Sequence, residues 1–422
     1  MHHRAATKLS GALIVCAGSL AGCTGGSTPV AGTDSAVSTS TTVRPDDGML
    51  LVGAILPRNG SAAELGLSMS DALSLALTEI NDAGGVGGSP VRLIEREEGD
   101  NPATASVAMV DLVQAGVDAI IGPTSSINTL ATLGTAVDAG ILTCSPTASA
   151  LALDAFPDDG LFLRTIASDT LQAEALASLV ESSGTSSAVV VYIDDNYGRP
   201  FAEAARLGVL AKGTSVEAMV GFTANEGSVG SAVEAVVAAD TDVVVVIADS
   251  TTGPAIIAAI DDASDNAPTF IVNDAIRRPA TSTQPFGRSL ASRIQGVSPL
   301  AYPSSESFMN SLHALDPATT ALFAHNAYDC LNVIALAAQA AASGRPSDIA
   351  RQVATITDGG TVCNSFPGCE QARIAGRNID YSGPGRDLTL GPDGDVLTAV
   401  FERFTFDATG RDIGDGFVTV GG

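Results

Sequence analysis

The chain has 422 residues, of which 45% are hydrophobic and 16% are charged, so it is long enough for two or three domains with large cores, and its composition excludes global disorder. The formal net charge is −26, and the first 22 residues contain Arg4 and Lys8 but no acidic residue, so the rest is even more acidic. Such a charge excludes nucleic acid and anionic lipid headgroups as preferred partners.

The first 22 residues have the layout of a secretory signal peptide: a short basic start, an apolar run over 9–22, and small residues before a cysteine. The string Leu20-Ala21-Gly22-Cys23 resembles the lipobox of bacterial lipoproteins. This resemblance implies cleavage before Cys23, a lipid on its thiol and an extracytoplasmic protein anchored to a membrane. The alternative is an ordinary signal peptide with an unrelated cysteine. The run is shorter than the roughly 20 apolar residues of a transmembrane helix.

Residues 23–48 are rich in Ser, Thr and Gly, which predicts a flexible tether. From residue 49, apolar runs alternate with segments of helical periodicity. The first series has predicted strands at 50–56, 91–95, 117–121 and 141–144 and helices at 69–80, from 101 onward, and at 127–139. The second has strands at 188–193, 216–220, 243–248 and 269–272 and helices at 200–211, 229–239 and 254–263. A long helix at 320–342 and a hairpin-like segment at 396–410 follow.

Strands that alternate with helices predict an α/β fold with parallel sheets, and two such series predict two Rossmann-like lobes. We place three hinge crossings near residues 164–168, 297–302 and 380–395. Lobe 1 is then expected to contain residues 49–165 and 300–390, and lobe 2 residues 166–299 and 391–422.

Four cysteines follow Cys23, and an oxidising compartment allows them to pair. Cys363 and Cys369 lie in one short loop with Gly and Pro, which predicts a local disulfide. For Cys144 and Cys330, a disulfide and two buried thiols remain open. The histidines after the signal peptide, 313 and 325, are too few for a zinc site, and we expect neither a metal nor a cofactor.

Common enzyme motifs are missing from the sequence. It contains no G-x-S-x-G elbow, no phosphate-binding G-x-x-x-x-G-K-[ST], no H-E-x-x-H, and no G-x-G-x-x-G after the first predicted strand. We therefore expect a protein that is not an enzyme, and an esterase-like lipoprotein is a disfavoured alternative.

Two loops that follow predicted strands contain the most informative polar residues. They span 122–128 and 145–151, and neither contains Lys or Arg. Open α/β sheets bind ligands at the carboxyl ends of their parallel strands. Backbone N–H groups and hydroxyls at a helix N-terminus can hold a carboxylate there, although ordinary helix capping also explains Ser and Thr at such positions.

Several motifs occur in the order typical of one family. They are Val52-Gly-Ala-Ile-Leu-Pro57, Glu79-Ile-Asn-Asp-Ala-Gly-Gly-Val86, Asp100-Asn-Pro-Ala103, Val117-Asp-Ala-Ile-Ile-Gly-Pro123, Ser145-Pro146, Leu163-Arg-Thr165, Asp194-Asp-Asn-Tyr-Gly198 and Ala327-Tyr-Asp329. Over residues 50–410 the chain resembles type I periplasmic substrate-binding proteins, most closely the leucine/isoleucine/valine-binding family of ABC importers. Leu65 departs from the aromatic residue that some aliphatic amino-acid binders carry, and the segment around Cys363 and Cys369 is an insertion relative to the shortest members.

The resemblance implies a monomeric solute-binding lipoprotein that binds an amino acid or a related carboxylate between its lobes and delivers it to an ABC permease. Ser126 matches the serine that holds the ligand carboxylate, and Ser125 beside it is a further ligand-binding candidate. The loop Thr147, Ala148 and Ser149 matches the one that supplies further carboxylate donors and a carbonyl for the ammonium. Tyr197 matches an aromatic residue of lobe 2. Asp274 matches the acid that pairs with the ammonium, and Asp249 is a competing candidate. A sensory or regulatory lipoprotein with the same fold is the alternative function.

Overall fold

The computed structural model describes residues 46–278, 282–299, 305–385 and 388–422, which belong to one compact unit. The predictions for the signal peptide, for Cys23 and for the tether up to residue 45 lie outside the described residues. Parts of the second and third predicted hinge crossings, at 300–302 and 386–387, also lie outside them.

The first sheet has five parallel strands in the order β2-β1-β3-β4-β5. The strands are β1 (Leu51–Leu56), β2 (Arg92–Glu97), β3 (Ala119–Ile121), β4 (Leu142–Ser145) and β5 (Phe162–Arg164). Because parallel sheets are covered on both faces, the central strands read as nearly continuous apolar runs. The three residues of β3, for example, are all buried.

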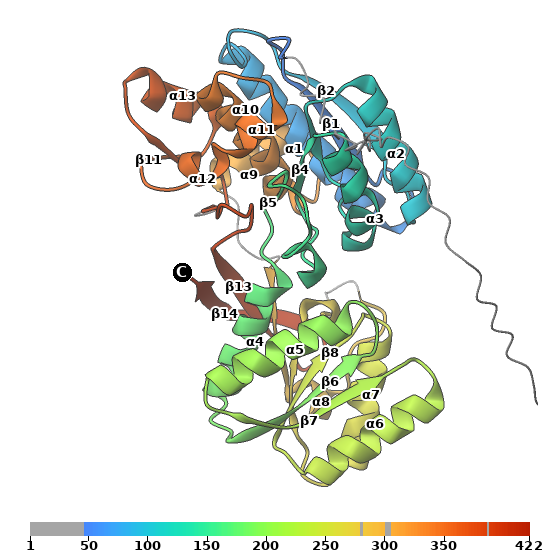
Figure 1. The fold of residues 1–422 in the computed structure, drawn as a ribbon. Helices are drawn as coiled ribbons and strands as arrows, with labels where there is room; N and C mark the ends of the chain where they lie inside the picture. The colour runs from blue at the N-terminus through green and yellow to red at the C-terminus, as the bar shows by residue number, and fades with distance from the viewer. Residues whose placement is uncertain (1–45, 279–281, 300–304, 386–387) are drawn as a thin grey trace, which may run out of the picture. The chain divides into compact units, whose positions relative to one another are not determined.

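Two pairs of helices cover this sheet (Figure 1). On one face, α1 (Ala63–Asp82) and α10 (Ala324–Ala341) pack against alternate residues of β1, such as Val52 and Ala54. On the other face, α2 (Pro102–Ala115) and α3 (Ser126–Asp138) pack near Ile55. The chain also forms η1 (Gly60–Ala62), η2 (Leu151–Leu153), α9 (Glu306–Leu315), α11 (Pro346–Ala350), α12 (Val353–Ile356), β11 (Thr361–Cys363), α13 (Phe366–Ile374) and β12 (Ile379–Tyr381).

The second sheet has seven strands in the order β14-β13-β10-β9-β8-β6-β7. The strands are β6 (Ser187–Ile193), β7 (Ser215–Phe222), β8 (Val243–Ile247), β9 (Thr269–Val272), β10 (Ile294–Ser298), β13 (Thr398–Phe406) and β14 (Asp412–Gly421). Strands β6 to β10 run parallel to one another, and β13 and β14 add an antiparallel edge. The central strand β8 is buried along its whole length, as expected for its run of valines.

Helices also cover both faces of the second sheet (Figure 1). One face packs against α4 (Asp169–Ser182) and α5 (Gly198–Ala211). The other face packs against α6 (Glu226–Ala239), α7 (Thr252–Ala263), the 3₁₀ helix η3 (Asp274–Ile276) and α8 (Arg288–Ala291).

The predicted fold class, two Rossmann-like α/β lobes joined by hinge segments, is confirmed. The exact division into lobes stays a prediction. The long helix was predicted to begin at residue 320, which is wrong, because Ala321 and Phe323 have positive φ angles of 54° and 51° and α10 begins only at Ala324. The sequence patterns also missed α4, β10 and α9.

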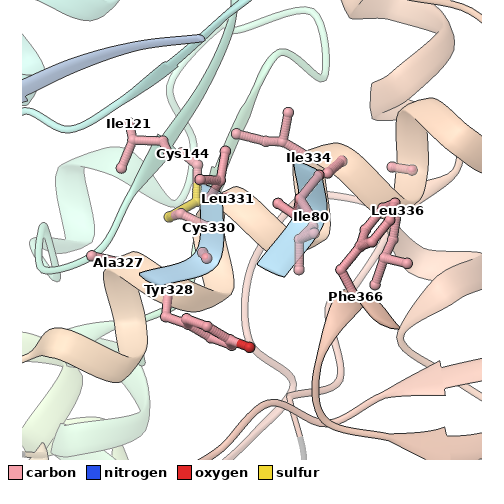
Figure 2. Packing of buried hydrophobic residues seen from close by; sticks show 14 of the residues in the cluster. Ile80, Ile121, Cys144, Ala327, Tyr328, Cys330, Leu331, Ile334, Leu336 and Phe366 are labelled. Carbon is pink, nitrogen blue, oxygen red and sulfur yellow. A yellow bond between two sulfur atoms is a disulfide. The ribbon is translucent and has the colours of Figure 1, made fainter. Parts of the chain in front are cut away.

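The structure pairs all four cysteines that follow Cys23. Cys363 lies 5.2 Å from Cys369 between Cα atoms, and Cys144 lies 5.8 Å from Cys330, and both pairs have disulfide geometry. Figure 2 shows the second pair inside the apolar cluster that joins β4 to α10. It therefore ties the end of a central strand to a helix 186 residues further along the chain.

Candidate functional site

The wall of lobe 1 consists of two strand-end loops that hold each other. Ser126 is the first residue of α3, directly after the loop that follows β3. Its Oγ accepts a hydrogen bond from the Ala150 N–H at 3.3 Å, and the Thr147 hydroxyl donates to the Thr124 carbonyl at 2.8 Å. Both Ser126 and Thr147 remain partly exposed, and the Ser126 hydroxyl, which only accepts here, keeps its hydrogen for a further partner.

A buried carboxylate that the sequence analysis missed occupies the N-terminus of α3. Glu98, which is 1% exposed, follows β2 and accepts from the Thr124 N–H at 2.8 Å, the Thr124 hydroxyl at 2.7 Å and the Ser125 N–H at 3.0 Å. The Asn128 amide donates to it at 2.9 Å. The protein itself therefore supplies the anion that a helix N-terminus favours. Ser125 is a predicted ligand-binding residue, and its N–H is already occupied by Glu98.

A buried guanidinium supports the second loop from below. Arg164 has no exposed surface and donates to the carbonyls of Ala148 and Ala150, both at 3.4 Å. It also pairs with Asp395 through Nε at 2.7 Å and with Asp154. One side chain thus fixes the loop around Ala148, the end of β5 and the segment that leads into β13.

The wall of lobe 2 has an aromatic ring and an acid. Tyr197 precedes α5, is partly exposed, and packs edge-on against Phe201 with ring centroids 5.8 Å apart. Its hydroxyl accepts from the Asn273 amide at 3.2 Å. Asp274 follows that asparagine, is half-buried, and accepts from the Gln172 amide at 2.9 Å.

Asp169, a second acid that the sequence analysis missed, lies beside Asp274. It is the first residue of α4, it is 2% exposed, and its Oδ2 has no hydrogen-bond partner among the described residues. Its N–H donates to the Ser149 carbonyl at 2.8 Å. Burial, with the charge of Asp274, raises the pKa of Asp169 to about 7, and burial also raises the pKa of Asp274.

Asp169 and Asp274 also affect the pKa of Tyr197. Burial and the negative charges of Asp169 and Asp274 raise the pKa of Tyr197 well above its usual value. The phenol of Tyr197 therefore stays in its neutral form near physiological pH.

The competing acid Asp249 has a different environment. Its Oδ1 accepts from the N–H groups of Thr251 and Thr252, both at 2.7 Å, and its Oδ2 accepts from the Thr252 hydroxyl at 2.7 Å. These hydrogen bonds outweigh desolvation and lower its pKa. Asp249 therefore serves as an internal cap at the start of α7, and its oxygens are already engaged.

The described part of the chain contains no cluster of three or more His, Cys, Asp or Glu side chains arranged to hold a metal ion. Among the same residues, no helix is both long and apolar enough to span a membrane. The candidate site brings together hydroxyls, backbone groups, one phenol and carboxylates.

Part of this chain is similar in sequence to curated proteins. The chain is 29% identical over 161 residues to the Leu/Ile/Val-binding protein BraC3 of Rhizobium johnstonii, a match that covers 37% of this chain and 42% of that protein. The matched region thus spans less than half of that relative's length.

Among solved structures, the branched-chain amino acid transporter substrate-binding protein LivJ of Streptococcus pneumoniae, in complex with isoleucine, has a TM-score of 0.62 at 18% identity over 89% of this chain and 100% of that one. A solute-binding protein of an ABC transporter from R. palustris, in complex with benzoate, has a TM-score of 0.61 at 17% identity over 89% and 98%. At these identities the likeness shows the fold alone. The model of one family, described as "periplasmic binding protein", matches residues 50–376, and the chain therefore belongs to the periplasmic binding protein family.

Proposed function

We propose that this protein is the solute-binding component of an ABC importer and that it binds an amino acid or a related small carboxylate between its two lobes. One observation carries the proposal. Hydroxyls and backbone groups without any Lys or Arg form the wall of lobe 1, whereas an aromatic ring and acids form the wall of lobe 2. A zwitterion, with an anionic end and a cationic end, complements this division of charge.

The anionic end belongs at lobe 1. Ser126 supplies a hydroxyl donor and the loop from Thr147 to Ser149 supplies backbone N–H groups, while Arg164 supports this loop without entering it. Such donors bind carboxylates through charge-assisted hydrogen bonds of about 1.5–3 kcal/mol each. The isoleucine and benzoate complexes of structurally similar proteins both contain a ligand with a carboxylate.

The cationic end belongs beside Asp274. Partial burial raises the pKa of this acid, and a carboxylate withdrawn from solvent is stabilised by a positive partner. Benzoate has no cationic group, so these acids favour an amino acid over an aromatic acid. Asp249 is a weaker candidate, since its oxygens already cap α7.

Ligand screening tests the proposal. Purified protein would be screened with amino acids, amides and aromatic acids by thermal shift, followed by calorimetry on Ser126→Ala, Ser149→Ala and Asp274→Asn. Each variant should lose affinity about ten- to a hundredfold. Thr135→Ala, an exposed substitution on α3, is the control and should bind like wild type. Unchanged affinity in all three variants would place the site elsewhere. Loss with the serine variants alone would indicate a carboxylate without an ammonium group.

We also propose that Cys23 carries the lipid anchor and that the protein is extracytoplasmic. Support comes from the basic start, the apolar run and the small residues before the cysteine. Cys23→Ala should release the protein from the membrane fraction or leave the precursor uncleaved. A processed mutant protein that still sediments with membranes would contradict the anchor.

A further inference from the structure

Arg164 connects three separate parts of the chain. Its side chain has no exposed surface, and all five N–H donors of its guanidinium have acceptors. Nη1 donates to the carbonyls of Ala148 and Ala150, both at 3.4 Å. Nε and Nη2 donate to Asp395 at 2.7 and 2.9 Å, and Nη2 also donates to Asp154. Because the guanidinium is planar and rigid, a shift of one partner is transmitted to the others.

One of these partners belongs to a segment that joins the two sheets. Asp395 lies between β12, whose Tyr381 packs in the core of lobe 1, and β13 of the second sheet. The preceding residue, Gly394, accepts a hydrogen bond from the Arg164 N–H at 3.0 Å. A Cβ atom on Gly394 would lie 2.2 Å from the Phe162 carbonyl oxygen, and its φ of 81° also favours glycine. The turn before β13 therefore lies directly against β5.

Another partner, Asp154, holds the segment that leads from β5 to α4 on the second sheet. Ser168 donates to both oxygens of Asp154 at 2.8 and 2.9 Å, and the Thr170 hydroxyl donates to it at 2.7 Å. At the other end of the segment, the Thr165 hydroxyl donates to the Asn326 carbonyl at 2.8 Å, and the Asn326 amide donates to the Thr165 carbonyl at 2.7 Å. This segment is thus bonded at both ends to groups that pack with the first sheet.

The loop that Arg164 holds is the one proposed to bind the solute carboxylate. Its Ser149 carbonyl also accepts from the backbone N–H of Asp169, the first residue of α4, at 2.8 Å. The two hydrogen bonds from Arg164 to the loop are the longest that the guanidinium makes, so the loop is its most easily displaced partner. The position of the loop therefore depends on how the carboxylates orient Arg164.

We propose that Arg164, oriented by Asp154 and Asp395, couples the solute loop to two of the segments that join the lobes, so that solute binding and lobe movement depend on each other. The inference rests on the proposed function and deepens it. It makes Asp154 and Asp395 positioning residues for binding, since they act on the loop through Arg164. Such coupling is reciprocal, so a change at the joining segment that displaces the loop must also change solute affinity.

Affinity measured by calorimetry tests the coupling in purified protein, with the amino acid that gives the largest thermal shift. Asp395→Asn should weaken binding about five- to a hundredfold. Asp154→Asn should also weaken it, and the double variant should lose less than the two single effects combined, because both act through one guanidinium. Asp261→Asn is the matched control. It breaks the ion pair with Arg293 beside the start of β10, its side chain is 20% exposed against 19% for Asp395, and it should bind like wild type.

The second measurement follows the lobes directly. Small-angle X-ray scattering should show that wild type becomes more compact when it is saturated with this amino acid, and that Asp395→Asn contracts less. Asp261→Asn should contract like wild type. An ion pair with only a structural role would lower the melting temperature on removal without changing affinity or contraction.

Thr170→Val provides a second variant if Asp395→Asn does not fold. Thr170 is exposed, and the substitution removes only its hydroxyl and the bond to Asp154. It should weaken binding about two- to fivefold, and Thr170→Ser should restore the affinity of wild type.

The outcomes separate this inference from the proposed function. Wild-type affinity and contraction in Asp395→Asn, or wild-type affinity in Thr170→Val if the first variant does not fold, would overturn the inference alone. Equal losses of affinity in Asp395→Asn and Asp261→Asn would also overturn it, because the effect would then be general destabilisation. Absence of binding by any solute to wild type would overturn the proposed function and this inference with it.

Discussion

The two walls of the site handle buried carboxylates in opposite ways. In lobe 1, Glu98 is fully buried and accepts four hydrogen bonds at the start of α3. In lobe 2, Asp169 is equally buried, but its Oδ2 has no partner among the described residues. Burial alone therefore does not tell whether an acid stabilises the fold. A satisfied carboxylate stabilises it, while an unsatisfied one lowers stability.

The largest expected effect is on the free energy of unfolding and comes from the disulfide that supports the wall of lobe 1. Removing the Cys144–Cys330 disulfide, as the double variant Cys144→Ala/Cys330→Ala, should cost about 4–5 kcal/mol in the free energy of unfolding, because it closes a loop of 186 residues. The matched variant Cys363→Ala/Cys369→Ala opens a six-residue loop and should cost only about 2 kcal/mol. Urea denaturation measures both. Equal losses would show that loop length does not govern stability here, and mass mapping without reductant checks the pairings.

The next largest effect on stability comes from Glu98, the hydrogen-bonded carboxylate of lobe 1. Glu98→Ala should reduce the free energy of unfolding by about 3–4 kcal/mol, because buried donors at Thr124, Ser125 and Asn128 lose their acceptor. Glu64→Ala, at an exposed position of α1, is the control and should change stability by less than about 0.5 kcal/mol. A Glu98→Ala protein as stable as wild type would remove the contrast between the walls.

The pH dependence of stability, measured without a ligand, tests the raised pKa values of two buried acids. Burial raises the pKa of Asp169 to about 7 and that of Asp329 to about 8. Between pH 5 and 8 the folded state then binds more protons than the unfolded state, so stability should fall as pH rises, by on the order of 3 kcal/mol for each of the two acids. Asp329→Asn keeps an acceptor for the Tyr381 hydroxyl and should remove part of this slope. Denaturation at pH 5 and pH 8 measures it, and a flat profile for wild type would contradict both shifts.

The smallest effect separates the two acids proposed for the ammonium. Asp249→Ala should cost about 1 kcal/mol of stability through loss of the α7 cap and should leave solute affinity unchanged. Asp274→Asn should weaken binding instead. Calorimetry on both variants decides between them, and a reversed result would make Asp249 the ligand-binding acid.

Much of the fold could be predicted from the sequence, because its signals are local. The valine run of β8 and the periodicity of α1 define their elements without help from the rest of the chain. The start of α10 was misjudged because Ala321 and Phe323 adopt left-handed backbone angles that no Gly or Asn signalled. Helix α4 was missed although Ser168 caps it through a hydrogen bond to the Thr170 N–H.

The candidate site could be proposed from the sequence only where its residues follow strands. Ser126, Tyr197 and Asp274 lie just after strands, so the alternation of elements placed them. Glu98 meets Thr124 across the intervening strand β1, because the strand order is β2-β1-β3, and that order is not encoded in any local pattern. Asp169 was missed with its helix, and its lack of a partner is a property of three-dimensional packing alone.

Arg164 has a consequence for the polarity of the loop above it. In a planar trans peptide, the carbonyl of one residue and the N–H of the next point in opposite directions. Because the carbonyls of Ala148 and Ala150 face the guanidinium, the N–H groups of Ser149 and Leu151 are directed away from it. The buried guanidinium of Arg164 thus orients the peptide dipoles of this loop. Their N–H ends favour an anion at the outer edge of the loop, although no positive side chain touches it.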